Sequence, residues 1–437
     1  MKVLKFGGTS VGSAQRMKNV GSIILDGDPK IVVLSAMSGT TNTLVEIAGY
    51  LHTNNPTGAS ETIGTMEQKY RTVLSELFAT DEYRKKTDEI LKSIFATLRN
   101  LTKKTIGPVE EKEILAQGEL LSTNMMHHYL LENGVKSVLL PALDYMRIDQ
   151  NREPDLGAIK ENLSILLQQN PVADIYLTQG FICRNDKNEI DNLERGGSDY
   201  SASLIGAVVE ATEIQIWTDI DGMHNNDPRM VDNTAPVRHL HFEEAAELAY
   251  FGAKILHPTC ILPAKLNNIP VRLLNTLQPD AQGTTISNEA EQGKIKAIAA
   301  KDGITAIKIK SGRMLLAYGF LRKVFEIFEK YQTPIDMITT SEVGVSVSID
   351  NKSKLPEIVA ELKKISTITV DENMVIICVV GDMQWDNVGF EARAVNALKD
   401  IPVRMISYGG SNYNISLLVK AEDKKRALQS LSEYLFK

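Results

Sequence analysis

The pattern of secondary structure along the chain changes once, near residue 294, and this change most constrains the fold. Before it, short apolar segments alternate with helix-periodic ones. Residues 31–36 (IVVLSA) are continuously apolar, as a parallel strand buried on both faces should be. Strands alternating with helices are typical of an α/β fold with a mostly parallel sheet. Strands are predicted at residues 1–6, 31–36, 137–140, 175–178, 214–218 and 271–274, and an accessory helical hairpin at 62–104.

Segments after Lys294 are shorter, and their order recurs. Residues 304–370 are predicted to form a strand, a helix, two strands, a helix and a final strand at 368–370. The same order begins again at 375 with a separate strand at 375–380. Asp336-Met337-Ile338 resembles Arg404-Met405-Ile406 at an offset of 68, and Val347 matches Ile415 at the same offset. This pattern predicts two βαββαβ units, each too small for a large core, that bury their apolar faces by pairing. An α+β tail without internal symmetry is the alternative.

Composition excludes several classes of protein. Hydrophobic residues make up 43% and charged residues 24% of the 437 residues, which is typical of a globular chain of two or three domains. The net charge of −7 argues against a nucleic-acid surface. Three isolated cysteines suggest neither a disulfide framework nor a zinc site. No run of 18 apolar residues and no signal peptide are recognised, so we expect a cytoplasmic protein.

Two glycine-rich turns before helical segments suggest anion sites. Lys5-Phe6-Gly7-Gly8-Thr9-Ser10 begins at the end of the first strand, and its glycines let backbone N–H groups approach a phosphate closely. Glu194-Arg195-Gly196-Gly197-Ser198-Asp199 precedes another helix, where a buried Asp199 could hold Mg²⁺ or the lysine. Each motif alone also fits a tight turn with a capped helix start.

Three further segments carry polar groups in suggestive places. Residues 217–222 (WTDIDG) end an apolar strand, and sites in open α/β sheets lie at the carboxyl ends of strands. Residues 251–258 (FGAKILHP) offer another lysine, and residues 117–122 (QGELLS) place Glu119 in a helix. A polar turn, a solvated lysine and a helix-stabilising glutamate are the alternatives.

Together these motifs resemble the aspartate kinase family. The resemblance extends over essentially the whole chain, because the motifs occur in the family's order and spacing: KFGGTS (5–10), SAMSGTTN (35–42), QGELLS (117–122), RGGSDYSA (195–202), WTDIDG (217–222), DPR (227–229) and FGAKILHP (251–258). It implies an amino-acid kinase fold over residues 1–294 and two ACT domains over 295–371 and 372–437. A strand at 296–300 would complete the second ACT domain, so that the first is inserted within it.

The resemblance also implies roles for individual residues. Lys5 and Asp199 would be catalytic, and Ser35, Thr41, Glu119, Arg195 and Ser198 would hold aspartate. Glu119 would take its α-amino group and Arg195 a carboxylate. ATP would bind together with Mg²⁺, without a dedicated metal site formed by protein residues. The residues implied to bind ATP are Lys5, Phe6, Gly7, Gly8, Thr218, Asp219, His224, Arg229, Lys254 and Ile255.

The C-terminal sensing module resembles that of the lysine-inhibited, monofunctional enzymes of this family, because the sequence ITTSEV (338–343) is similar to theirs. L-lysine is the expected effector, with threonine second, and paired ACT units imply a homodimer. Glu194, His224 and Ala317 depart from the family's usual residues. The effector residues implied are Met314, Ala317, Gly319, Phe320, Leu321, Asp336, Thr340, Ser341 and Glu342.

The chemistry agrees with the residues available. A carboxylate is already nucleophilic at neutral pH, so phosphoryl transfer to aspartate reduces to alignment and charge neutralisation. The expected reaction moves the γ-phosphate of MgATP to the side-chain carboxylate, the first step of lysine, threonine and methionine biosynthesis. Two alternatives stay open: a sibling amino-acid kinase and a non-catalytic amino-acid sensor.

Overall fold

The chain forms two compact units. The computed structural model describes residues 1–193, 196–253, 257–311 and 318–436. The first unit comprises Met1–Met223 with Ile255–Asn288, and the second comprises His224–Lys254 with Glu289–Lys437. Residues 224–254 therefore pack with the C-terminal part of the chain. The boundaries inferred for the three domains stay predictions.

A mostly parallel sheet forms the centre of the first unit, which confirms the predicted fold class. All its neighbouring strands pair in parallel except β12, which is antiparallel to β11. The strands lie within one or two residues of the predicted ranges. Their spatial order is β12 (Thr284–Ser287), β11 (Val271–Asn275), β7 (Glu213–Thr218), β1 (Lys2–Phe6), β2 (Lys30–Leu34), β4 (Ile175–Gln179) and β3 (Ser137–Leu140).

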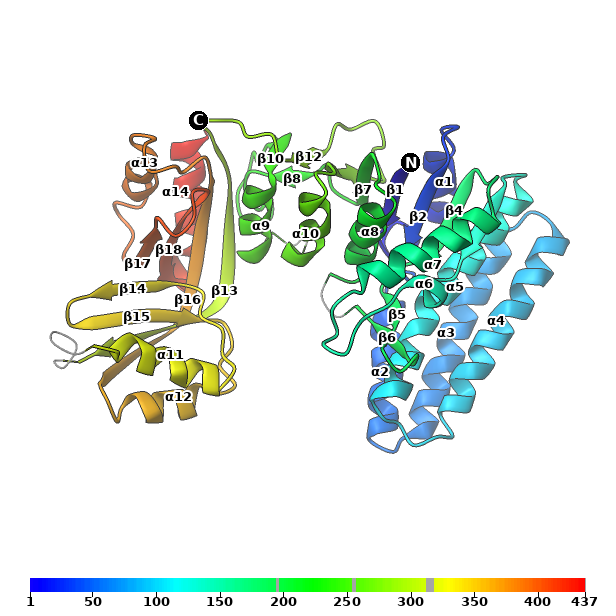
Figure 1. Cartoon of the computed structure of the whole chain (residues 1–437), viewed down its shortest axis with the longest axis horizontal. Coiled ribbons are helices and arrows are strands. Elements are labelled where there is room, and N and C mark those ends of the chain that lie inside the picture. The colour runs from blue at the N-terminus through cyan, green and yellow to red at the C-terminus, as the bar shows by residue number, and fades with distance from the viewer. Residues whose placement is uncertain (194–195, 254–256, 312–317, 437) are drawn as a thin grey trace. The chain divides into compact units, whose positions relative to one another are not determined.

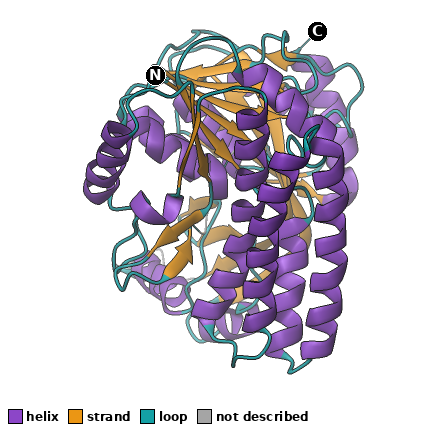
Figure 2. Ribbon diagram, turned by 90° about the vertical axis from the view of Figure 1, so that its right-hand side faces the viewer, coloured by secondary structure: helices purple, strands orange, loops and turns teal. Residues whose placement is uncertain are grey.

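Alternation along β1 assigns its two faces to different helices. Leu4 and Phe6 join the core built with five helices, so Val3 and Lys5 point to the opposite face, where α8 (Gly197–Val208) packs on β1, β2 and β7. The long helices α3, α4 and α5 run side by side (Figure 1 and Figure 2). The five helices are α1 (Ala14–Ile24), α2 (Thr40–His52), α3 (Pro56–Leu77), α4 (Asp81–Leu101) and α5 (Pro108–Glu132).

The predicted accessory hairpin corresponds to α3 and α4. Among the described residues, no helix is both long and apolar enough to cross a membrane. The first unit also contains α6 (Ala142–Tyr145), α7 (Leu156–Gln169), β5 (Ile182–Arg184), β6 (Ile190–Asn192) and α10 (Pro258–Leu266).

A six-stranded antiparallel sheet forms the centre of the second unit. Two long strands run through both halves of this sheet, so the halves share a continuous backbone ladder. The strand order is β14 (Ile338–Ser341), β15 (Gly344–Ile349), β13 (Ile295–Lys310), β16 (Thr367–Gly381), β18 (Asn414–Lys420) and β17 (Val403–Tyr408). The helices are α9 (Phe242–Tyr250), α11 (Phe320–Lys330), α12 (Leu355–Leu362), α13 (Phe390–Ala397) and α14 (Lys424–Leu435).

The two repeats are related through the pairing of β13 with β16. Residues Ile295–Lys301 pair with the second half of β16, whereas Ile304–Lys310 pair with its first half and with β15. Each long strand carries a left-handed residue at the crossing, Gly303 with φ +79° and Asn373 with φ +56°. The register shifts there, so each strand bends between the two halves.

Two details of the sequence analysis are corrected by this ladder. The strands predicted at 368–370 and 375–380 form the single strand β16, because the bend at Asn373 does not interrupt pairing. Val347 pairs with Ile307, and Leu417 pairs with Ile377. Val347 is therefore equivalent to Leu417, at an offset of 70, because the paired residues Ile406 and Leu417 are two positions further apart in sequence than Ile338 and Val347.

Candidate active site

The carboxyl ends of four neighbouring strands, β7, β1, β2 and β4, meet at one edge of the first unit's sheet. Phe6 pairs with Leu34 and Trp217, and Leu34 pairs with Gln179. The turns that follow these strands therefore lie next to one another, with β1 at the centre. β1 has β2 on one side and β7 on the other, and such a change of direction is where open α/β sheets bind ligands.

A buried ion pair lies at this edge. Lys5 Nζ is 2.7 Å from Asp199 Oδ1, and only 11% and 18% of the two side chains are exposed. Lys5 comes from the end of β1, and Asp199 from the first turn of α8. Of the two roles that the sequence allowed for Asp199, the structure shows the contact with the lysine. A buried ammonium needs such a partner, and the carboxylate fixes where it points.

The glycine pair after β1 makes the turn tight. A Cβ on Gly8 would lie 2.8 Å from the carbonyl oxygen of Ala36 and 3.3 Å from the amide of Ser38, and Ser38 N donates to Gly8 O at 3.0 Å. A Cβ on Gly7 would lie 3.5 Å from Lys5 Nζ. The backbone of Gly7 therefore lies beside the ammonium group, and Gly8 packs against the turn after β2.

The second glycine-rich turn packs against the first unit's interior. Gly196 has φ +76°, and a Cβ there would meet Cys260 Sγ at 2.0 Å, so this position requires glycine. The turn starts α8 and brings Ser198 Oγ within 2.9 Å of Ser35 Oγ, which donates to it. Two of the predicted substrate residues therefore touch across the site, although 163 residues separate them in sequence.

Glu119 is buried beside the turn after β2. Its Oε1 accepts a hydrogen bond from Ala36 N at 3.1 Å, its Oε2 has no partner among the described residues, and 3% of the residue is exposed. Burial raises the pKa of Glu119 to about 7, opposed by hydrogen bonds to backbone N–H groups and by the charge of Lys5. An unpaired buried carboxylate oxygen is suited to an ammonium group.

Other predicted residues of the first unit lie at the same edge in different environments. Thr218 ends β7, and Asp219 is exposed after it. The side chain of Phe6 is fully buried and stacks on Trp217 at 5.6 Å, so only its backbone faces the turn. Thr41 is exposed in the first turn of α2, whereas the adjacent Thr40 is buried and hydrogen-bonded to Tyr70.

Three side chains at this edge received no role in the site from the sequence motifs. Ser10 Oγ and Thr276 Oγ1 lie 2.8 Å apart, and Thr276 donates to Thr218 O. Ser122 Oγ donates to Ser35 O at 2.8 Å and so holds the turn after β2. Thr276 lies two residues after the strand predicted at 271–274, and this position near a strand end is the signal that could have identified it.

The remaining predicted nucleotide and substrate residues belong to the second unit or lie outside the described residues. His224 and Arg229 belong to the second unit, where His224 Nδ1 is 2.9 Å from Thr234 Oγ1 and Arg229 makes a two-pronged contact with Asp227. Glu194, Arg195, Lys254 and Ile255 lie outside the described residues. The roles predicted for all of these stay predictions.

Comparison with known proteins identifies the family. The model of the amino acid kinase family matches residues 1–275, and an ACT domain model matches residues 377–435. The chain is 32% identical to lysine-sensitive aspartokinase 3 of Escherichia coli over 99% of both chains. The chain belongs to the aspartokinase family.

Solved aspartokinase structures also match over their full length. The structure of E. coli aspartokinase III with aspartate and ADP, in its R-state, is 32% identical and superposes with a TM-score of 0.85 over 100% of both chains. The T-state structure of that enzyme, with lysine and aspartate, is 33% identical in sequence and superposes with a TM-score of 0.80, also over 100% of both chains. The resemblance read from the motifs is thereby confirmed.

The predicted effector segment of this aspartokinase lies in the first repeat. Gly319 caps α11 with φ +83°, Phe320 is buried and Leu321 is partly exposed. Thr340, Ser341 and Glu342 are exposed around the β14–β15 turn. Asp336 is already engaged, because its Oδ1 lies 2.7 Å from Lys301 Nζ and accepts from the Tyr250 hydroxyl at 2.8 Å. Met314 and Ala317 lie outside the described residues.

Replacing Gly8 with alanine should damage the site specifically. The new Cβ would collide with the Ala36 carbonyl and push apart the turns after β1 and β2, so we expect kcat/KM to fall by about 10²-fold or more, since small misplacements are costly. Steady-state kinetics will measure this. Gly49→Ala is the matched control, because its Cβ meets nothing within 4 Å inside α2 and should stabilise by about 0.5–1 kcal/mol. Equal activity in both variants would contradict the assignment.

Proposed function

We propose that this aspartokinase transfers the γ-phosphoryl group of MgATP to the side-chain carboxylate of L-aspartate. The observation that carries the proposal is the buried Lys5–Asp199 pair beside Gly7 and Gly8, at the carboxyl end of the central strand. The ammonium and the backbone N–H groups neutralise charge on the migrating phosphoryl group, while Asp199 holds the ammonium in place. Mg²⁺ enters with the nucleotide; among the described residues, no cluster of three or more His, Cys, Asp or Glu forms a metal site.

Aspartate is held next to this centre by complementary charges. Glu119 takes the α-ammonium group with its unpartnered Oε2, and Ser35 and Ser198 line the approach. Arg195, adjacent to the Gly196 turn, takes a carboxylate. The nucleophile needs no general base, since an aspartate carboxylate is ionised at neutral pH. Thr218 and Asp219 border the nucleotide, and His224, Arg229, Lys254 and Ile255 complete its site.

The second unit senses L-lysine in this proposal. Support comes from the T-state structure of E. coli aspartokinase III, which was solved with lysine and aspartate. Lys301 and Tyr250 engage Oδ1 of Asp336, and only 1% of this side chain is exposed, so the exposed Glu342 is the carboxylate more accessible to a cationic side chain. Thr340 and Ser341 directly precede Glu342, and Gly319, Phe320 and Leu321 complete the proposed effector set. A homodimer formed through the ACT domains and a cytoplasmic location remain predictions.

Loss of the Lys5 ammonium should impair turnover more than folding. We expect Lys5→Ala to lower kcat by about 10²–10³-fold, or about 3–4 kcal/mol, as for the loss of one preorganised donor. ADP release with MgATP and aspartate measures kcat, and circular dichroism checks the fold. Lys2→Ala, in the same strand, should keep normal turnover. If the wild-type protein releases no ADP, the non-catalytic amino-acid sensor is favoured. If it phosphorylates glutamate but not aspartate, a sibling amino-acid kinase is favoured.

Aspartate binding should depend on the ionisation of Glu119. Its pKa of about 7 means that the carboxyl is protonated at lower pH and cannot pair with an ammonium group. KM for aspartate should therefore fall as pH rises through about 7 and then level off. Glu119→Gln should remove this dependence and raise KM by about 10–100-fold, the effect of losing a charged hydrogen bond. Glu113→Gln, on the same helix, is the control, and its KM should show the wild-type dependence on pH. If KM of the wild-type enzyme did not change with pH, the proposed role of Glu119 in binding aspartate would be refuted.

Sensitivity to lysine tests the regulatory part independently. We expect L-lysine to inhibit the wild-type enzyme and Glu342→Gln to raise the half-inhibitory concentration about tenfold or more, because an ion-paired hydrogen bond is lost. Inhibition curves with lysine and with threonine measure this. Glu357→Gln in α12 is the control. Inhibition by threonine alone would overturn the choice of effector without affecting the catalytic assignment.

A further inference from the structure

The first repeat of the second unit contains a charge cluster at the bend of its long strand. Lys301 Nζ lies 2.7 Å from Asp336 Oδ1 and 2.9 Å from Asp350 Oδ2. The Tyr250 ring covers the ammonium at 4.3 Å, and its hydroxyl donates to Asp336. We call these charged residues the first cluster. One cation lies between two carboxylates, and α9 supplies the aromatic group that closes the cluster.

The second repeat carries the same cluster with inverted signs. The ladder makes Asp371 equivalent to Lys301 and Lys420 equivalent to Asp350, both at an offset of 70. Arg404 is equivalent to Asp336 at an offset of 68. Asp371, Arg404 and Lys420 form the second cluster, with Arg404 Nε donating to Asp371 Oδ2 at 2.7 Å. One carboxylate here accompanies two cations.

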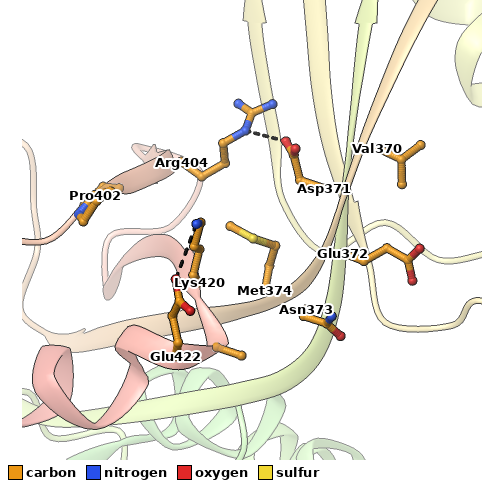
Figure 3. A pocket seen from close by; sticks show the side chains of 11 residues that line it. Val370, Asp371, Glu372, Asn373, Met374, Pro402, Arg404, Lys420 and Glu422 are labelled. Carbon is orange, nitrogen blue, oxygen red and sulfur yellow. Dashed lines mark hydrogen bonds and ion pairs between the residues drawn. The ribbon is translucent and has the colours of Figure 1, made fainter.

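The second cluster borders a hollow of about 630 Å³, whereas Tyr250 covers the first. Arg404 and Lys420 lie on one side of this hollow and Asp371 and Glu372 on the other, with Met374 between them (Figure 3). Its size falls in the range of small-molecule sites. The apolar part of the lining consists of Val370, Met374, Pro402, Val403 and Ala421.

Both cations of the second cluster retain binding capacity. Arg404 uses Nε for Asp371, and its terminal nitrogens bond to no residue within the described ranges. Lys420 contacts Glu422 at 3.4 Å, but both side chains are more than 60% exposed, so this pair is weak. Glu372 also lines the hollow, and its pair with Lys352 at 3.2 Å is likewise exposed and therefore weak. The lining of the hollow therefore contains Arg404 and Lys420, each beside a carboxylate (Asp371 and Glu422), together with Glu372 and an apolar surface.

We propose that this hollow binds a small organic carboxylate. The free edge of the Arg404 guanidinium matches a carboxylate in a two-pronged contact, because Asp371 fixes the plane of the group from the other side. Lys420 adds a point charge, and the apolar residues accept the carbon chain of the ligand. This site is separate from the catalytic edge and from the effector segment at 319–342, so it does not depend on the proposed function.

Methyl NMR of the full-length protein tests this site directly. Butyrate, a carboxylate with an apolar chain, should shift the ε-methyl signal of Met374 saturably, with the signal assigned through Met374→Leu. Lys420→Gln keeps the Arg404–Asp371 pair and should weaken binding about threefold or more, and Arg404→Gln about tenfold or more. Arg426→Gln, an exposed arginine paired with Asp423, is the matched control and should bind as wild type.

Three outcomes would overturn the proposal. The first is a Met374 signal that butyrate does not move, and the second is unchanged binding in both Lys420→Gln and Arg404→Gln. The third is an inorganic phosphate affinity equal to that of butyrate, which would show that charge alone is recognised and not a carboxylate with an apolar body. The Met374 side chain lines the hollow in the second unit, whereas the catalytic edge belongs to the first unit.

Discussion

The buried ion pair between Lys5 and Asp199 is the interaction on which the catalytic unit depends. An ammonium group at the end of the central strand is costly to bury, and α8 makes it tolerable by placing a carboxylate 2.7 Å away. This requirement explains the local sequence. Gly7 and Gly8 keep the turn after β1 close to the ammonium, and Gly196 lets α8 start close enough for Asp199 to reach it. The Lys5 ammonium and the backbone N–H groups at this edge are the kind of positive groups that phosphoryl transfer requires.

In the regulatory unit, the main physical constraint is the stability of two small repeats. Each repeat alone has a small apolar core, and the shared strands β13 and β16 join the two cores through one ladder. Left-handed residues at Gly303 and Asn373 let both strands bend at the junction. Repetition of the backbone did not require repetition of charge, and the cluster at the bend is inverted between the repeats. One fold therefore presents two chemically different surfaces.

Much of the fold could be predicted because its signals are local. Continuous apolar runs such as residues 31–36 identify buried parallel strands, and the recurring order after Lys294 identifies the repeat. The prediction failed where the signal was not local. The bend at Asn373 resembles a strand end in sequence, and only the ladder shows that β16 continues through it. The offset of 68 held for β14 and β17 but not for β15 and β18, because the intervening turn changes length.

The sequence by itself determined the family and the parallel sheet and supplied the candidate site residues, because motifs and apolar periodicity are properties of contiguous residues. Only the tertiary structure decided which of these residues meet. Ser35 reaches Ser198, Ala36 donates to Glu119, and Asp336 is held by Lys301 and Tyr250. Burial and partner choice depend on segments far apart in the chain, and they control whether a carboxylate such as Glu119 is ionised at neutral pH.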